Sequence, residues 1–254
     1  MIATLALVAI LGAAGNDAEI LVSAASSLRG VIDEVVEAYR EHFPGTDVAI
    51  NTAASGVLLR QIERGAPVDL FLSASREEVD VLEAQGLVRA RKGFAANRLV
   101  VVVPGGRSPP KSFEGLSAER FERIAIGNPG TVPAGRYARE SFETLGLLDA
   151  IESRLVFGET VRHVLDWAVR GEVDAALVYA TDAALVADRI AIGPIAPPGS
   201  HTGIFYEGAV IEGARNPGLA LQLLEFLGSG PGEEILSRKG FMIPPDTRFA
   251  IPPQ

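Results

Sequence analysis

The chain has 254 residues and a formal net charge of −9, with 48% hydrophobic and 22% charged residues. This length is sufficient for two modest domains. The chain contains no cysteine, which excludes disulfides, thiolate catalysis and cysteine metal sites. The acidic balance, without a cluster of lysine and arginine, argues against a nucleic-acid-binding surface. The three histidines are scattered and lack the spacing of metal ligands.

Residues 1–15 are predicted to be a signal peptide. They are predominantly apolar and end in small residues, which predicts cleavage near Ala14 or Gly15. The stretch is too short to span a membrane. It lacks the positively charged residues that usually begin a signal peptide, as expected if the first residues of the signal peptide are missing from the sequence. The alternative is a buried first strand or helix. We expect the remainder to be a soluble protein that is periplasmic or otherwise exported.

The first part of the chain alternates between predicted strands and helices. Apolar residues recur with a helical period after Leu28, and Ser26 or Ser27 is the expected N-cap of that helix. Ser75 and Glu78 form a capping box before a later helix. Strands are predicted at residues 19–24, 47–51 and 69–72, with helices beginning near residues 28, 55 and 75.

The second part continues the alternation, and a segment rich in Pro and Gly at residues 196–200 is expected to return the chain to the first unit. Further strands are predicted at residues 98–103, 123–127, 154–157, 174–179 and 207–212, with helices at residues 134–145, 180–187, 216–228 and 233–239 and one beginning at residue 161. This order predicts an α/β protein with two lobes, each a mostly parallel sheet flanked by helices. One lobe comprises residues 19–96 and 204–254, and the other comprises residues 97–203.

The segment Val132–Ala138 is the centre of the predicted site. A buried strand at residues 123–127 is broken by Asn128-Pro129-Gly130, and Pro133 then suits the first turn of a helix. Its next residues are small and leave the free N–H groups of the helix start accessible. Such a start, with its positive dipole end, favours an anion.

Four predicted helix starts share this character: Ser27, Ser55, Ala134 and Val161. Taken singly, each is more simply a cap or a packing residue. None is followed by an acidic residue in its first turn, where the dipole would favour one, although Glu159 precedes Val161. Tyr179 ends a predicted strand at the same sheet edge. The sequence therefore predicts an anion site made of these helix starts and one phenol.

An enzymatic function has little support in the sequence. Ser27 or Ser55 would need a base, and no histidine lies near a predicted strand end. The nucleophile-elbow, dinucleotide and phosphate-loop motifs are absent. The carboxylates Asp69, Asp174 and Asp182 are more simply caps or surface residues.

Several segments resemble the periplasmic molybdate-binding proteins of ABC transporters, and Val-Pro-Ala-Gly-x-Tyr-Ala at residues 132–138 is the most diagnostic. The segments are Ala24–Leu28, Ala54–Gly56, Arg60–Ala74, Asn97–Val100, Asn128–Ala138 and Gly171–Ala183. The resemblance implies a two-lobed type II periplasmic-binding-protein fold with an oxyanion in the cleft between lobes. It implies hydroxyl ligands from Ser27, Ser55 and Tyr179, and backbone amide ligands mainly from Ala134 and Val161. Ser26 could share the role of Ser27, and Gly56 stands where many relatives have serine.

The resemblance implies a binding protein that captures molybdate, and tungstate with it, and delivers the ion to the membrane permease of an ABC importer. No cofactor and no direct metal ligand are expected, because the metal is bound as its oxyanion. We expect a monomer that does not bind nucleic acid. Two further hypotheses stay open. One is a binding protein for sulfate, another anion or a small organic acid, which Arg136 and Arg162 would suit, and the second is a secreted hydrolase.

Overall fold

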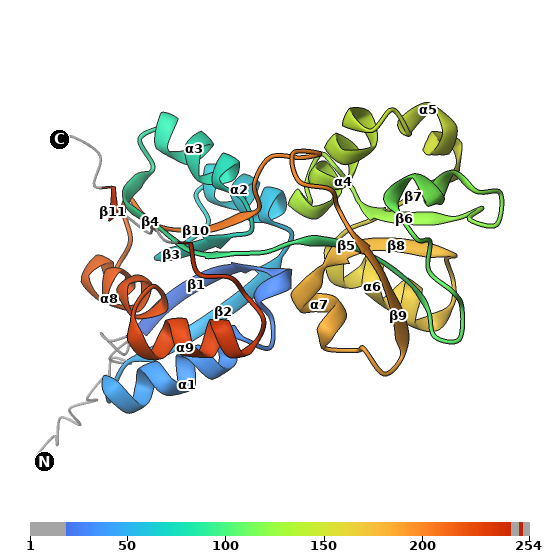
Figure 1. Ribbon diagram of the computed structural model, residues 1–254. Coiled ribbons are helices and arrows are strands. Elements are labelled where there is room, and N and C mark those ends of the chain that lie inside the picture. The colour runs from blue at the N-terminus through green and yellow to red at the C-terminus, as the bar shows by residue number, and fades with distance from the viewer. Residues whose placement is uncertain (1–18, 245–248, 251–254) are drawn as a thin grey trace, which may run out of the picture.

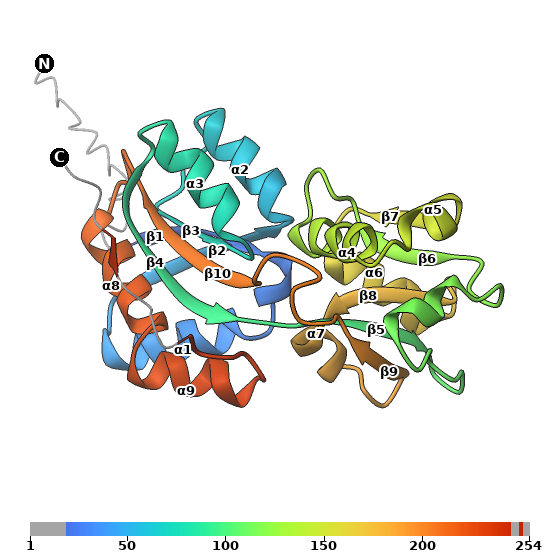
Figure 2. The same cartoon turned by 45° about the horizontal axis from the view of Figure 1, so that its top comes forward.

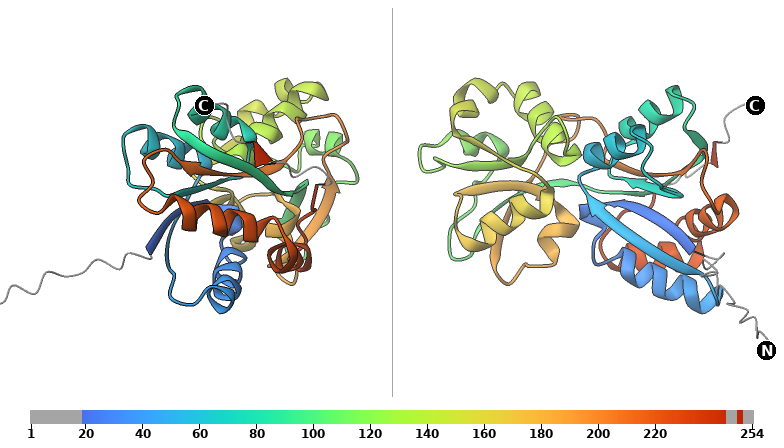
Figure 3. Two further views of the ribbon diagram at one scale, coloured as in Figure 1. Left: turned by 90° about the vertical axis from the view of Figure 1, so that its left-hand side faces the viewer. Right: turned by 180° about the vertical axis from the view of Figure 1, so that it is seen from behind.

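The computed structural model describes residues 19–244 and 249–250, and the predicted signal peptide lies outside these residues. The chain forms two sheets side by side, each flanked by helices, as Figure 1 shows. We call the six-stranded sheet with α1–α3, α8 and α9 lobe I, and the five-stranded sheet with α4–α7 lobe II. The same two-lobed outline is seen from behind in Figure 3.

Lobe I has the strand order β11-β4-β10-β3-β1-β2. Strands β1, β2 and β3 are parallel, whereas β10, β4 and β11 add antiparallel pairs. Its elements are β1 (Glu19–Ala25), a 3-10 helix (Ser26–Leu28), α1 (Ile32–His42), β2 (Asp47–Ala53), α2 (Ser55–Glu63), β3 (Leu70–Ser73), α3 (Arg76–Ala84), β4 (Val88–Ala96), β10 (Phe205–Ile211), α8 (Pro217–Leu227), α9 (Gly230–Arg238) and β11 (Phe249–Ala250).

Lobe II has the strand order β7-β6-β8-β5-β9, with β6 parallel to β7 and β8, and β5 antiparallel to β8 and β9. Its elements are β5 (Leu99–Pro104), a 3-10 helix (Phe113–Ser117), β6 (Ile124–Gly127), α4 (Pro133–Thr144), α5 (Leu148–Ile151), a 3-10 helix (Glu152–Arg154), β7 (Leu155–Gly158), α6 (Val161–Arg170), β8 (Ala175–Tyr179), α7 (Ala180–Ala184) and β9 (Ile190–Ile195).

Between residues 19 and 244 the chain crosses between the lobes twice, and the two crossings touch. The first is the short link after β4, and the second is the segment 196–204 before β10. Asn97 N donates to Ile204 O at 3.1 Å, and Asn97 Nδ2 donates to Thr181 Oγ1 at 2.8 Å. Both crossings lie in short segments between strands, which is where the hinges of domain closure are usually found.

Central strands are buried because helices cover them. All five residues of β8 are buried, and the strand contacts α4, α6 and α7. All four residues of β3 are likewise buried. Strands that are buried on both faces read as continuous apolar runs, which is why the sequence located them correctly.

Three expectations need correction. The first helix begins at Ile32, after a separate 3-10 helix, because Gly30 adopts φ of +91° and turns the chain between them. Neither Ser26 nor Ser27 is therefore its N-cap. Each sheet is mixed, since parallel strands are joined by antiparallel ones. Strand β4 was not predicted, because two of its basic residues, Arg91 and Lys92, are buried against distant partners. Arg91 Nε lies 2.6 Å from Glu207 Oε1, and Lys92 Nζ donates to Gly228 O at 2.9 Å.

Candidate functional site

The predicted site residues converge where the two lobes meet. In lobe I, β1 ends just before Ser27, and α2 begins at Ser55. In lobe II, α6 begins at Val161 and β8 ends at Tyr179. Ligands of α/β proteins bind beyond the carboxyl ends of strands. The junction of the lobes is therefore the expected place for a ligand.

A cavity of about 10 Å³ lies at this junction, close to the roughly 10–15 Å³ that one water molecule needs. Four of the five predicted ligand residues line it, and Ala134 does not, although the two residues before it do. The lining residues are Ala25, Ser26, Ser27, Ala54, Ser55, Ala74, Val132, Pro133, Val161 and Tyr179. The lobes are thus packed closely around the site.

Both predicted serine ligands keep a hydroxyl hydrogen to donate. Ser27 Oγ accepts a hydrogen bond from Tyr206 Oη at 2.9 Å, and Ser55 Oγ accepts one from the backbone N–H of Ala74 at 3.1 Å. A hydroxyl that accepts from the protein still has its own hydrogen for another acceptor. Ser26 lines the same cavity and stays a candidate beside Ser27.

Backbone donors from both lobes add to these hydroxyls. Within residues 19–244, the N–H groups of Ser55, Ala134 and Val161 have no hydrogen-bond acceptor. Helices α2, α4 and α6 carry no acidic residue in the first turn. Free N–H groups at the positive end of a helix dipole favour an anion. At α6 one donor is already used, because Thr160 Oγ1 accepts from His163 N at 3.1 Å.

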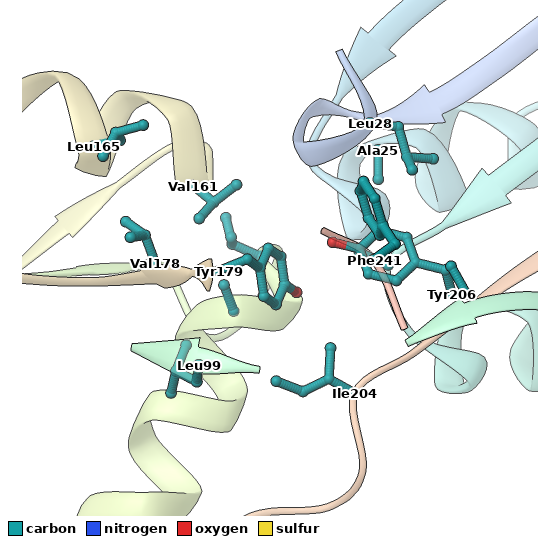
Figure 4. Close-up of a cluster of buried hydrophobic side chains, with 14 of the residues drawn as sticks. Ala25, Leu28, Leu99, Val161, Leu165, Val178, Tyr179, Ile204, Tyr206 and Phe241 are labelled. Carbon is teal, nitrogen blue, oxygen red and sulfur yellow. The ribbon is translucent and has the colours of Figure 1, made fainter. Parts of the chain in front are cut away.

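Tyr179 presents a buried hydroxyl that lacks a partner in the described part of the chain. The residue is 1% exposed, and its ring lies 5.8 Å from that of Tyr206. Figure 4 shows the two side chains extending toward each other from opposite lobes. Burial raises the pKa of Tyr179 well above its usual range, so the phenol is protonated and acts as a donor. A buried polar group without a partner is costly, which points to a ligand acceptor here.

Sequence reasoning missed Tyr206, which positions Ser27. Tyr206 lies in β10, is fully buried, and donates to Ser27 Oγ, while Asn97 Nδ2 approaches its hydroxyl at 3.4 Å. Nothing in the local sequence distinguishes it from a packing tyrosine, because its partners lie on distant segments.

Arg136 and Arg162 follow the helix starts at Ala134 and Val161, and both are engaged by protein groups. Arg136 Nη2 lies 3.1 Å from Glu78 Oε1. Arg136 Nε lies 2.6 Å from Glu77 Oε2, although that contact is not aligned as a hydrogen bond. Arg162 Nε lies 2.9 Å from Asp182 Oδ1, again without hydrogen-bond alignment, and Nη2 donates to Arg29 O at 2.8 Å. Neither guanidinium lines the cavity.

The lobes also meet through backbone atoms beside the site. Gly56 N, in the first turn of α2, donates to Thr131 O at 3.0 Å. A Cβ atom at Gly56 would lie 2.9 Å from both Cα and O of Thr131. Only glycine therefore permits this approach.

The buried Asp182 carboxyl predicts a dependence of stability on pH. Burial raises its pKa from 3.8 to about 7, and Arg162 opposes the shift in part. Between these values the unfolded chain is ionised and the folded chain is protonated, so folding takes up a proton. The free energy of unfolding should fall by on the order of a few kcal/mol as pH rises from about 4 to 7, and then level off. Urea unfolding at several pH values should show this slope in the parent and a flatter one in Asp182→Asn. Equal slopes in both proteins would contradict the assignment.

In the part of the chain that the structure describes, no group of three or more His, Asp or Glu side chains could hold a metal ion. None of the described helices has the length and apolar character needed to cross a membrane.

The chain is similar to known proteins. The model of the bacterial extracellular solute-binding protein family matches residues 20–242. The chain is 33% identical over 239 residues to the molybdate-binding protein ModA of Escherichia coli, covering 91% of each sequence. It is 31% identical over 231 residues to ModA of Haemophilus influenzae, covering 88% of this chain and 90% of the relative.

A solved structure shares the fold. The periplasmic molybdate-binding protein of Azotobacter vinelandii matches with a TM-score of 0.79 at 24% identity, covering 89% of this chain and 99% of that one. The two-lobed α/β architecture expected from the sequence is thereby confirmed.

Proposed function

This chain belongs to the bacterial extracellular solute-binding protein family, and from that premise we propose that it captures molybdate, and tungstate with it, between its lobes. The single observation that carries the proposal is the Tyr179 hydroxyl, which is 1% exposed, has no acceptor among the described residues and lines the cavity beside Ser27 and Ser55. The relatives named as molybdate-binding support the identity of the ion.

The chemistry of the lining fits a fully deprotonated oxyanion. None of the ten described lining residues is Asp, Glu, Asn or Gln, so their side chains supply hydroxyl donors and no carboxylate or amide acceptor. A tetrahedral dianion offers only acceptors and is satisfied by such a set. Phosphate that carries a proton also needs an acceptor and is disfavoured. Sulfate has the same charge as molybdate and a smaller size, so the distance at which the two lobes close around the ion must separate them.

An organic-acid ligand and a hydrolase reaction both have less support. A small organic acid would recruit an arginine, but both arginines near the site already contact protein groups. A hydrolase would need a base for Ser27 or Ser55, and none of the described lining residues is His, Asp, Glu or Lys. We therefore propose binding without catalysis and without a cofactor.

The proposed function also implies a cellular location, a membrane partner and a movement of the two lobes. We propose a monomer that is periplasmic or otherwise exported, passes the ion to the permease of an ABC importer and does not bind nucleic acid. The two moving bodies are residues 19–96 with 204–254, and residues 97–203. Separation of these bodies would admit the ion, and closure would bring the donors of both lobes onto it.

Isothermal titration with molybdate, tungstate, sulfate and phosphate tests the proposal. We expect one molybdate or tungstate ion per chain and far weaker phosphate binding. Phosphate affinity within about tenfold of molybdate affinity, a gap of only ~1.4 kcal/mol, would overturn the all-donor site. A sulfate affinity above that of molybdate would instead favour a sulfate-binding protein.

A further inference from the structure

Arg136 of lobe II reaches across the lobe boundary to the start of α3 in lobe I. Arg136 Nη2 donates to Ser75 Oγ at 3.0 Å and to Glu78 Oε1 at 3.1 Å, and Arg136 Nε lies 2.6 Å from Glu77 Oε2. Helix α4 faces α2 and α3 across this boundary, as Figure 2 shows. One guanidinium thus joins three side chains of the opposite lobe.

The Glu78 carboxylate makes this contact more than a surface ion pair. Glu78 is 3% exposed, and Ser73 Oγ donates to its Oε2 at 3.3 Å. Among the described residues, the only cation that contacts Glu78 is Arg136. A buried carboxylate without a cationic partner is strongly unfavourable. In this arrangement of the lobes the Glu78 carboxylate is buried, and its counter-ion comes from the opposite lobe.

Arg136 also lies two residues after Ala134, whose free N–H is a proposed ligand of the ion. Both residues belong to the first turn of α4. A guanidinium that fixes this turn against α3 also fixes the Ala134 amide relative to Ser55 of lobe I.

We propose that Arg136 is a positioning residue. Its contacts with Ser75, Glu77 and Glu78, which we call the clasp, hold the lobes closed and so slow release of the ion. The proposal rests on the proposed oxyanion function. Loss of one partner of a buried charge pair acts mainly on the dissociation rate. The association rate should change little, because Arg136 does not line the cavity that the ion enters.

The test compares dissociation and association rates of molybdate in the parent, Arg136→Ala and Arg139→Ala. Arg139 is a matched control on the same helix, because its guanidinium pairs with Glu143 within lobe II at 2.8 Å. We expect Arg136→Ala to raise the dissociation rate by about tenfold or more, with association within about threefold of the parent. Arg139→Ala should match the parent. Equal dissociation rates in the two variants overturn the clasp.

A second arm separates a clasp from a merely structural role. Adding Glu78→Gln to Arg136→Ala should recover part of the lost affinity, because the orphaned buried charge is removed. Arg136→Lys, which keeps the charge and threatens the fold least, should lie between the parent and Arg136→Ala. No recovery in the double variant, together with a parent-like Arg136→Lys, overturns the proposal.

A third arm needs no ligand. The chain has no cysteine, so Val81→Cys and Asp149→Cys would be the only spin-label sites, one on each lobe. If the parent fails to bind any oxyanion, the proposed function is wrong. The distances between the two spin labels then still test whether Arg136 holds the lobes together. A wider distribution in Arg136→Ala than in Arg139→Ala supports it, and identical distributions overturn it.

Discussion

Replacing Gly56 by alanine is expected to weaken molybdate binding by about ten- to a hundredfold while the ligand-free protein stays folded. The added Cβ would lie 2.9 Å from Thr131 Cα and O, which are backbone atoms that cannot rotate away. Overpacking of this kind costs about 1–3 kcal/mol. It also displaces the hydrogen bond from Gly56 N to Thr131 O.

The penalty should fall on the closed state alone. Gly56 lies in α2 and does not adopt a positive φ, so alanine suits its own backbone and favours the helix by up to about 1 kcal/mol. Titration should show the lost affinity, and urea unfolding without ligand should show equal or slightly higher stability. Gly218→Ala in α8, where an added Cβ meets nothing within 4 Å, is the matched control. A less stable Gly56→Ala protein with parental affinity would mean that the contact belongs to the fold and not to closure.

Tyr179→Phe is expected to weaken molybdate binding by about ten- to a hundredfold and to leave the fold intact. Phenylalanine fills nearly the same volume in the fully buried β8. The lost group is one O–H donor to a charged acceptor, where a hydrogen bond contributes roughly 1.5–3 kcal/mol. In the ligand-free protein the change removes a buried hydroxyl without a partner, so stability should hold or rise.

Tyr39→Phe supplies the control for this substitution. The Tyr39 hydroxyl is also in a buried residue, but it donates to Gln222 Oε1 at 2.8 Å, away from the cavity. Its loss should cost about 1 kcal/mol of stability and leave the affinity unchanged. Parental affinity in Tyr179→Phe would make Tyr179 a packing residue and place the site elsewhere.

The sequence predicted the parts of the fold that depend on local patterns. Continuous apolar runs located β3, β6 and β8, and Pro133 after a chain break located the start of α4. Strand β4 was not predicted because Arg91 and Lys92 read as solvent-exposed until their partners in distant segments are known. Gly30 similarly separates a 3-10 helix from α1, which the helical period did not reveal.

In the site, too, local patterns predicted some residues but not the contacts that support them. Ser27, Ser55, Val161 and Tyr179 were predicted, and they line one cavity. Their supporting contacts were not predictable, since Tyr206 reaches Ser27 across 179 residues of sequence and Arg136 reaches Glu78 across 58. The ligand roles of all five predicted residues, Ala134 among them, stay predictions. Helix starts follow from local sequence, whereas the contacts that close two lobes follow only from their packing.

A crystal structure of the protein grown with tungstate, recorded with anomalous scattering from tungsten, tests the central claim most directly. We predict one strong peak between the lobes, with oxyanion oxygens in hydrogen-bonding reach of Tyr179 Oη, Ser27 Oγ and Ser55 Oγ and of the Ala134 and Val161 amides. A peak elsewhere on the chain, or an ion at the junction that Tyr179 does not contact, would contradict this site.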